Sequence, residues 1–276
     1  MLEATLLALG AAVLHAGWNL LLKTSESRFF TAWGQFLVGG IVMLPVLVAI
    51  GFPQADSLPY LVITSIVHVV YVVALVRAYH HGDFGIAYPL ARGGGALVAA
   101  IAGVAFLSDD LSTWSWLAIA IVSGGLASLV RRHVGYVALL WAGLTAVTIG
   151  TYTALDAAGA RRTDSGVAYG IAAFIGAGIA ISVFGWTRGR VGDFTRYLRS
   201  DWQRVAAGGT ASVVAYAMVL AGVRLAPVGY VAALRESSVV LGAAAGWLLL
   251  KEGFGRARLV SSVVVAAGLV LLVASR

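Results

Sequence analysis

Three ionisable residues lie deep inside apolar stretches of this 276-residue sequence. Arg92 follows the segment Tyr88-Pro89-Leu90-Ala91, and Arg235 and Glu236 are adjacent, about nine residues into another apolar run. In a membrane-spanning helix such a group costs at least ~2.5–3.5 kcal/mol, so it normally faces a partner or a wet cavity. Two guanidiniums and one carboxylate leave a net positive site, which suits a carboxylate, phosphate or phosphonate ligand.

Two interpretations of these three charges stay open at the level of sequence. In the first, they line a substrate cavity. In the second, Arg92 and Glu236 form an ion pair that only locks two parts of the protein together, while Arg235 extends to the membrane surface. Glu236 is also the candidate for proton coupling, because burial and the adjacent arginines have opposite effects on its charge.

Polar and aromatic residues recur at helical spacing in three further apolar runs. Residues three, four or eleven positions apart share one helix face. One such stripe alone is typical of a hydrogen bond between neighbouring helices, whereas three together favour one shared polar cavity. The stripes are His15, Trp18 and Asn19; His68, Tyr71 and Tyr79; and Tyr152, Asp156 and Gly159.

The elements that must position these residues are membrane-spanning helices. The chain is 60% hydrophobic and 11% charged, whereas a soluble domain is about 25% charged, so its surface must face lipid. A bilayer core needs about 20 apolar residues per helix. This predicts an all-α polytopic membrane protein with ten spans, at 3–23, 29–50, 58–80, 84–107, 112–130, 134–157, 164–186, 203–224, 228–250 and 256–274. In the fourth span, Pro89 and Gly93-Gly94-Gly95 indicate either a broken helix at a cavity wall or close helix packing.

The two halves of the chain resemble each other weakly, in the right order. With five spans per half, the second copy must enter the membrane upside down, as in the inverted repeats of secondary transporters. We therefore predict one repeat at 1–131 and an inverted one at 132–276, with chance similarity between apolar stretches as the alternative. A shift of 143 residues superimposes Arg92 on Arg235, Asp109 on Glu252 and Gly125 on Gly268.

The basic residues indicate an orientation. Thirteen of the 19 Lys and Arg residues fall in loops on one side, four on the other, and two inside spans. The positive-inside rule then places both termini outside the cell. The net charge of +7 does not indicate nucleic-acid binding, because the basic residues form no stripe interleaved with aromatic residues.

Metal binding and catalysis are poorly supported. The sequence has no Cys, and it contains no GxSxG, HExxH or P-loop motif, so no enzymatic activity, metal or cofactor is predicted. His80-His81 with Asp83 is a weak metal candidate, because neighbouring residues of a helix or turn point apart and no further ligand lies at useful spacing.

Four segments together resemble the EamA branch of the drug/metabolite transporter superfamily. They are HAGWNLLLK at 15–23, AYHHGD leading into AYPLAR at 78–92, YTALDAAGAR at 152–161 and LLKE at 249–252. The resemblance implies ten helices in two inverted repeats, with spans 1, 3, 4, 6, 8 and 9 around a central cavity and spans 5 and 10 at the periphery. It also implies a secondary transporter, often an exporter of amino acids or other small metabolites, with both termini in the cytoplasm, against the charge count. Phosphate-carrying members of the superfamily similarly use basic residues on cavity helices.

The sequence thus predicts a secondary transporter, an exporter of a small metabolite, in the bacterial inner membrane as a monomer or homodimer. The metabolite carries a carboxylate, phosphate or phosphonate group and moves by alternating access. A flippase for a lipid-linked anion and a non-transporting membrane scaffold are the alternatives. The predicted substrate-binding residues are Arg92, Arg235, Glu236, Tyr88, Tyr71, His15, Trp18, Asn19, His68, Tyr152, Asp156 and Tyr216.

Overall fold

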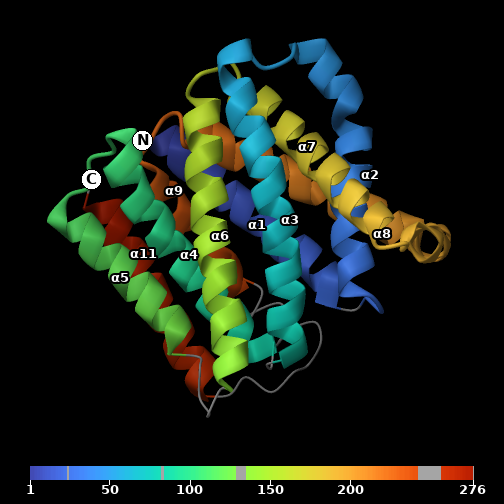
Figure 1. Cartoon of the computed structure of the whole chain (residues 1–276). Coiled ribbons are helices and arrows are strands. Elements are labelled where there is room, and N and C mark those ends of the chain that lie inside the picture. Colours follow the sequence, from blue (N-terminus) through green and yellow to red (C-terminus); the bar gives the residue numbers. More distant parts are fainter. Residues whose placement is uncertain (24, 82–83, 129–134, 242–255, 276) are drawn as a thin grey trace.

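The computed structural model consists of helices joined by short connections (Figure 1). It describes residues 1–23, 25–81, 84–128, 135–241 and 256–275, without the side chains of 19–23, 79, 84–89 and 256–259. No β-strand is present in these ranges. The elements are α1 (Leu2–Lys23), α2 (Arg28–Ile50), η1 (Ala55–Ser57), α3 (Leu58–His81), α4 (Phe84–Leu107), α5 (Thr113–Ala127), α6 (Tyr136–Ala160), α7 (Gly166–Thr187), α8 (Val191–Gly222), α9 (Val228–Arg235) and α11 (Arg256–Ala274).

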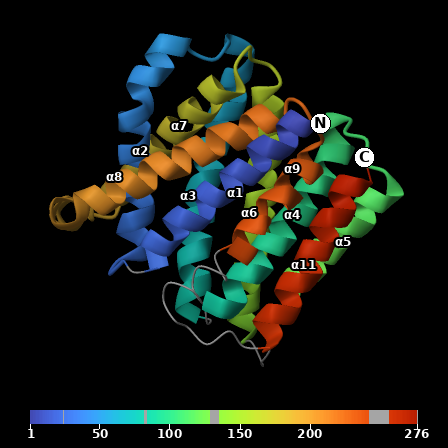
Figure 2. The ribbon, with the colours of Figure 1, turned by 180° about the vertical axis from the view of Figure 1, so that it is seen from behind.

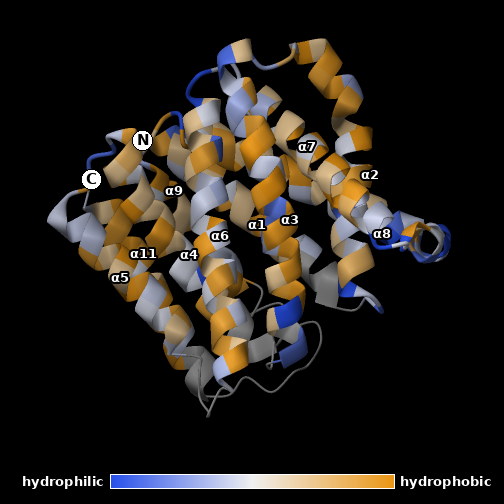
Figure 3. Cartoon of the chain, viewed as in Figure 1, coloured by the Kyte–Doolittle hydropathy of each residue, from blue (hydrophilic) through white to orange (hydrophobic). Residues whose placement is uncertain are grey.

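The helices have the length and composition of membrane spans, which confirms the predicted all-α polytopic membrane protein. Within the described residues, six helices are long and apolar enough to cross a bilayer, and three shorter apolar helices accompany them. Figure 3 shows hydrophobic residues along the helix faces on the side in view. Exposed aliphatic side chains such as Val62 and Ile66 suit contact with lipid, because every backbone group of a helix is already hydrogen-bonded. The count of ten spans stays a prediction.

The structure interrupts the ninth predicted span, whereas the sequence suggested a break in the fourth. α4 runs from Phe84 to Leu107 without a break, because its glycines serve close packing: a Cβ at Gly95 would lie 2.5 Å from Ile149 of α6. The predicted ninth span, 228–250, is instead interrupted. α9 ends at Arg235, Glu236 forms a turn, and residues 237–241 are helical again.

Helix α8 begins earlier than the predicted span at 203–224. It starts at Val191 and kinks at Asp201, whose φ and ψ are −132° and 25°. The basic residues of its first part predict a loop, but Phe194 in this part is buried against the protein. Phe194 stacks on Trp33 of α2, with ring centroids 3.9 Å apart.

Neighbouring helices approach closely at glycines. α4 packs on α6, α1 and α2 pack on α8, and α5 packs on α11; Figure 2 shows α1 beside α8 and α11 beside α5. A Cβ at Gly125 of α5 would lie 3.0 Å from Val265 of α11, and one at Gly268 of α11 would lie 2.9 Å from Val122 of α5. Lipid is as apolar as the helix surfaces, so no hydrophobic effect drives helices together in a membrane. Close van der Waals packing at small residues stabilises their association instead.

Helices α2 and α8 are in direct backbone contact, which predicts opposite effects on stability for two glycine-to-alanine variants. A Cβ at Gly39 would lie 2.6 Å from the carbonyl oxygen of Gly209, whereas Gly143 has no neighbour within 4 Å. We expect Gly39→Ala to lower the free energy of unfolding by about 1–3 kcal/mol through overpacking. Gly143→Ala should raise it by about 0.5–1 kcal/mol, because alanine is the better helix former. Thermal unfolding of both variants in one detergent measures this; shifts of the same sign would contradict the packing.

Candidate functional site

Eight helices surround one cavity near the centre of the protein. Its walls come from α1, α2, α3, α4, α6, α7, α8 and α9, and its volume is about 90 Å³. Eight of the predicted site residues line it: His15, Trp18, His68, Tyr71, Arg92, Tyr152, Tyr216 and Arg235.

The cavity spans the middle of the helices. Its lining residues on α1 lie in the second half of that helix, and those on α2 and α4 lie in the first half, which places them nearer the end where α1 joins α2 and α3 joins α4. Its lining residues on α6, α7 and α8 lie nearer the opposite end, where α6 joins α7 and α8 joins α9.

Arg92 and Glu236 form the ion pair that the second interpretation of the sequence proposed. Arg92 Nη2 lies 2.7 Å from Glu236 Oε1, and Nε lies 3.1 Å from Oε2. Such a two-point contact is the strongest form of an arginine–carboxylate pair. The pair joins α4 to the turn after α9, and Glu236 itself is 1% exposed and is not among the residues that line the cavity.

Arg235 does not extend to the membrane surface. It is 6% exposed and lines the cavity, and within the described residues its Nε has no hydrogen-bond partner. No carboxylate of that part of the chain forms an ion pair with it either. Ser212 Oγ, on another wall, is likewise buried without a partner there. Buried polar groups of this kind normally require a partner, so both atoms are available to a ligand.

Asp156 lies behind the cavity wall, fully buried. Its Oδ2 accepts hydrogen bonds from Thr64 at 3.0 Å and from the Tyr216 hydroxyl. Its Oδ1 accepts one from the Tyr169 hydroxyl at 3.2 Å. We call Asp156, Thr64, Tyr169 and Tyr216 the Asp156 cluster. Tyr216 is its only member among the residues that line the cavity.

The aromatic stripes predicted from the sequence meet in this cavity. His68 stacks on Tyr152 with ring centroids 4.3 Å apart, and Tyr71 lies edge-on to Tyr152 at 5.4 Å. In α1, Trp18 Nε1 donates to His15 Nδ1 at 3.2 Å. The side chains of Asn19, Tyr79 and Tyr88 lie outside the described residues.

Some lining residues were not predicted. Gln35 and Phe36 of α2, Phe174 of α7 and Ser212 of α8 line the cavity, although α2 and α7 are not among the spans that the resemblance places around it. These residues are uncharged and therefore stand out less in an apolar run than arginines do. Gln35, an amide in the apolar run 29–50, is the signal that could have identified the α2 wall.

No metal centre is formed by the residues that the structure describes, since no group of three His, Asp or Glu side chains comes together there. The weak candidate at His80 and His81 includes Asp83, which lies outside the described ranges.

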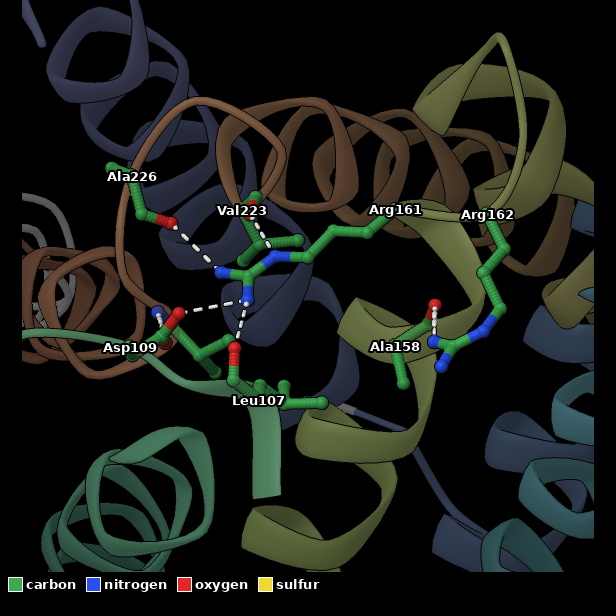
Figure 4. A network of polar contacts seen from close by, with 8 residues as sticks. Leu107, Asp109, Ala158, Arg161, Arg162, Val223 and Ala226 are labelled. Atoms are coloured by element: carbon green, nitrogen blue, oxygen red, sulfur yellow. Dashed lines mark hydrogen bonds and ion pairs between the residues drawn. The ribbon is translucent and has the colours of Figure 1, made fainter. Parts of the chain in front are cut away.

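At the opposite end, one arginine ties together the ends of several helices (Figure 4). Arg161, directly after α6, contacts Asp109 Oδ1 at 2.7 Å and donates to the carbonyl oxygens of Leu107, Val223 and Ala226 at 3.5, 2.9 and 3.3 Å. These carbonyls end α4 or follow α8, where helices leave acceptors unsatisfied. Asp109 also accepts from the backbone N–H of Val228, the first residue of α9, at 2.6 Å. We call Arg161, Asp109 and the three carbonyl groups the Arg161 network.

Comparisons with known proteins agree with this architecture. The model of the EamA-like transporter family matches residues 136–274. A solved structure described as "Crystal structure of protein" aligns with a TM-score of 0.78 at 17% sequence identity, over 99% of each chain. That likeness supports the fold alone. No curated protein matches the sequence.

Proposed function

The chain belongs to the EamA-like transporter family of the drug/metabolite transporter superfamily, and from this premise we propose that it is a secondary transporter of small organic anions. Members of this family are membrane transporters of small molecules rather than enzymes. The proposal adds the class of substrate: a metabolite with a carboxylate, phosphate or phosphonate group. It also adds export by alternating access across the bacterial inner membrane, the direction that the family resemblance favours.

The charge balance of the cavity carries the proposal. The bidentate contact with Glu236 neutralises Arg92, which leaves the buried guanidinium of Arg235 as an excess positive charge at the cavity wall. A buried cation needs a counter-ion or hydrogen-bond acceptors. A bound carboxylate or phosphate would supply both, because its oxygens match the planar guanidinium.

The remaining walls suit an organic molecule rather than a bare inorganic ion. Trp18, Phe36, Tyr71, Tyr152 and Phe174 all line the cavity. Sites for small molecules typically combine such aromatic walls with a few polar groups that fix orientation. The proposed ligand therefore has an apolar or aromatic body attached to its anionic group.

The arrangement of helices supports alternating access. The cavity spans the middle of the helices, and the Arg161 network ties helix ends together at one end of the molecule. An inverted repeat would exchange α1 with α6, α3 with α8 and α4 with α9. The contacts occur in such pairs: α4 packs on α6 and α9 on α1, while α3 packs on α6 and α8 on α1. Two repeats that rock about a central site would open the two ends in turn.

Counterflow in proteoliposomes tests the function. Vesicles loaded with benzoate, phenylphosphonate, glutamate or phosphate are diluted into the same labelled anion, and uptake is followed. We expect at least one organic anion to exchange. Arg235→Gln should reduce its exchange at least about tenfold, because removing a charge-assisted hydrogen bond costs about 1.5–3 kcal/mol. Arg235→Lys should retain more activity than Arg235→Gln, because it keeps the charge.

Arg162→Gln is the matched control. Its guanidinium donates to the carbonyl of Ala158 and lies over the Tyr60 ring, away from the cavity lining. If Arg235→Gln folds and exchanges every anion as well as Arg162→Gln does, the anion proposal is wrong. Exchange of neutral or cationic metabolites without any anion would also contradict the anion proposal.

A further inference from the structure

We propose that Asp156 is the proton-binding site of this protein, that Tyr216 connects it to the substrate cavity, and that a proton binds together with the anionic substrate. This rests on the proposed function, to which it adds a coupling ion and a named carboxylate. Glu236, the candidate indicated by the sequence, is held by Arg92 in a two-point contact. Asp156, unlike Glu236, has no arginine beside its carboxylate within the described residues.

Only neutral groups face the Asp156 carboxylate. The three donors come from different helices: Thr64 from α3, Tyr169 from α7 and Tyr216 from α8. The other titratable groups nearby are His68 on α3, which contacts Thr64, and Tyr152 on α6. Tyr60 on α3 lies near Tyr169, and the charge of Arg235 on α9 acts on Tyr216. Within the described residues, no Lys, Arg or His forms an ion pair with Asp156.

A carboxyl group in this setting can exist with or without its proton. Complete burial without a cation disfavours the ionised form, whereas three hydroxyl donors stabilise it. The two effects oppose each other, so a modest change in surroundings shifts the balance. Tyrosine and threonine hydroxyls can also rotate to accept a hydrogen bond from a protonated carboxyl group, so the Asp156 cluster can serve both states.

Asp156 lies between the cavity and the closed end. On α6 it follows Tyr152, a cavity residue, by four positions and precedes Arg161 by five, which corresponds to about 6 Å and 7.5 Å along the helix. On the cavity side, Tyr216 is both a lining residue and a donor to Asp156. On the other side the carboxyl group is fully buried, so water would reach it only if that end of the helices opened. A proton on Asp156 can thus be exchanged with one side of the membrane at a time.

The sign of the coupling follows from electrostatics. An anion in the cavity is attracted by Arg92 and Arg235, which line it, and is repelled by an ionised Asp156 in low dielectric. Protonation removes that repulsion, so anion and proton favour each other's binding, and the effect is reciprocal. The two would move together. Export of an accumulated acid down its own gradient then carries a proton out with it.

The first experiment needs no known substrate. Infrared difference spectra of the purified protein, recorded between acidic and alkaline pH, should contain the band of a buried protonated carboxyl group. Asp156→Asn should lack this band, and Glu236→Gln should retain it. A band that survives in Asp156→Asn and disappears in Glu236→Gln would overturn the proposal. Because no anion is added, the result is independent of the proposed function.

The second experiment uses the organic anion with the largest counterflow among benzoate, phenylphosphonate and glutamate. We compare its accumulation driven by an imposed pH gradient with its counterflow in the same vesicles. The ratio of pH-driven accumulation to counterflow should fall at least about tenfold in Asp156→Asn, because a variant that cannot bind the proton is uncoupled. An unchanged ratio, or accumulation in the wild type opposite in direction to the proton gradient, would overturn the proposal. Absence of counterflow in the wild type would refute the proposed function instead, and the infrared result would still stand.

Two tyrosine variants separate coupling from a purely structural role and also serve if Asp156→Asn fails to fold. Tyr216→Phe and Tyr169→Phe each remove one hydroxyl donor from the same carboxylate, but only Tyr216 lines the cavity. We expect Tyr216→Phe to lower the ratio of pH-driven accumulation to counterflow more than Tyr169→Phe does, because Tyr216→Phe also removes the connection to the cavity. Equal ratios in the two variants would contradict the connection through Tyr216.

Discussion

Replacement of Glu236 by alanine is expected to lower the free energy of unfolding by about 3–5 kcal/mol, because it leaves the Arg92 guanidinium buried without its counter-ion. Arg92 is 4% exposed, and its two contacts with Glu236 are 2.7 and 3.1 Å long. Unfolding by denaturant in a fixed detergent micelle measures the change.

A double variant separates the loss of the pair from the loss of the carboxylate alone. Arg92→Met combined with Glu236→Met removes both charges and keeps most of the volume, so we expect it to be close to wild type in stability or up to about 1–4 kcal/mol more stable. A double variant as unstable as Glu236→Ala would contradict the pair as the cause. Its effect on counterflow is a separate result, since Arg92 also lines the cavity.

Replacement of Arg161 by alanine is expected to open the end of the molecule that the Arg161 network closes. The change removes an ion pair with Asp109, whose side chain is 6% exposed, together with donors to three carbonyl groups. Charge-assisted hydrogen bonds are worth about 1.5–3 kcal/mol each, so the open form should become at least about tenfold more populated. The native chain has no Cys, so a single Ala157→Cys, buried one turn before Arg161, can report the opening by its rate of labelling with an impermeant maleimide.

The neighbouring arginine supplies the control for this prediction. Arg162 donates to one carbonyl, that of Ala158 in its own helix, and its guanidinium lies over the Tyr60 ring near the start of α3. It has no contact with the carbonyl groups of the Arg161 network. We expect Arg162→Ala to leave labelling of Ala157→Cys unchanged. Equal labelling rates in the Arg161 and Arg162 variants would show that the Arg161 network does not keep this end closed.

The sequence predicted the cavity well where its residues are unusual for a membrane. Charges are rare in spans, so Arg92 and Arg235 were candidate cavity residues from their position, with an ion-pair lock and a surface-reaching Arg235 as the alternative. Helical spacing placed His15 with Trp18 and His68 with Tyr71. The partners could not be predicted in the same way. Asp156 was predicted as a member of a stripe and as a substrate-binding residue, but its contacts with Thr64 and Tyr216 were not predicted, because these partners lie 92 and 60 residues away in the sequence.

Helix boundaries were less predictable, because local residue types and tertiary packing compete. Pro89 and three glycines suggested a break in α4, but packing against α6 keeps that helix continuous. The turn at Glu236 contains no Gly or Pro and gave no local signal. The start of α8 contains many charged residues, which predict a loop. Its helical structure depends on a tertiary contact, the stacking of Phe194 on Trp33 of α2, which the local sequence does not show.

The ion pair between α4 and the turn after α9 also sets an order of events during synthesis. Glu236 follows Arg92 by 144 residues, so at roughly 5–20 residues per second about 7–30 s pass before the partner of Arg92 exists. During that time α4 has left the ribosome before the Glu236 carboxylate is made, and an arginine in the middle of a lipid bilayer costs ~2.5–3.5 kcal/mol or more. The helix must therefore wait beside water or protein at the insertion machinery, and α9 completes its transfer into the bilayer. Truncated chains that end before Glu236 should remain associated with that machinery.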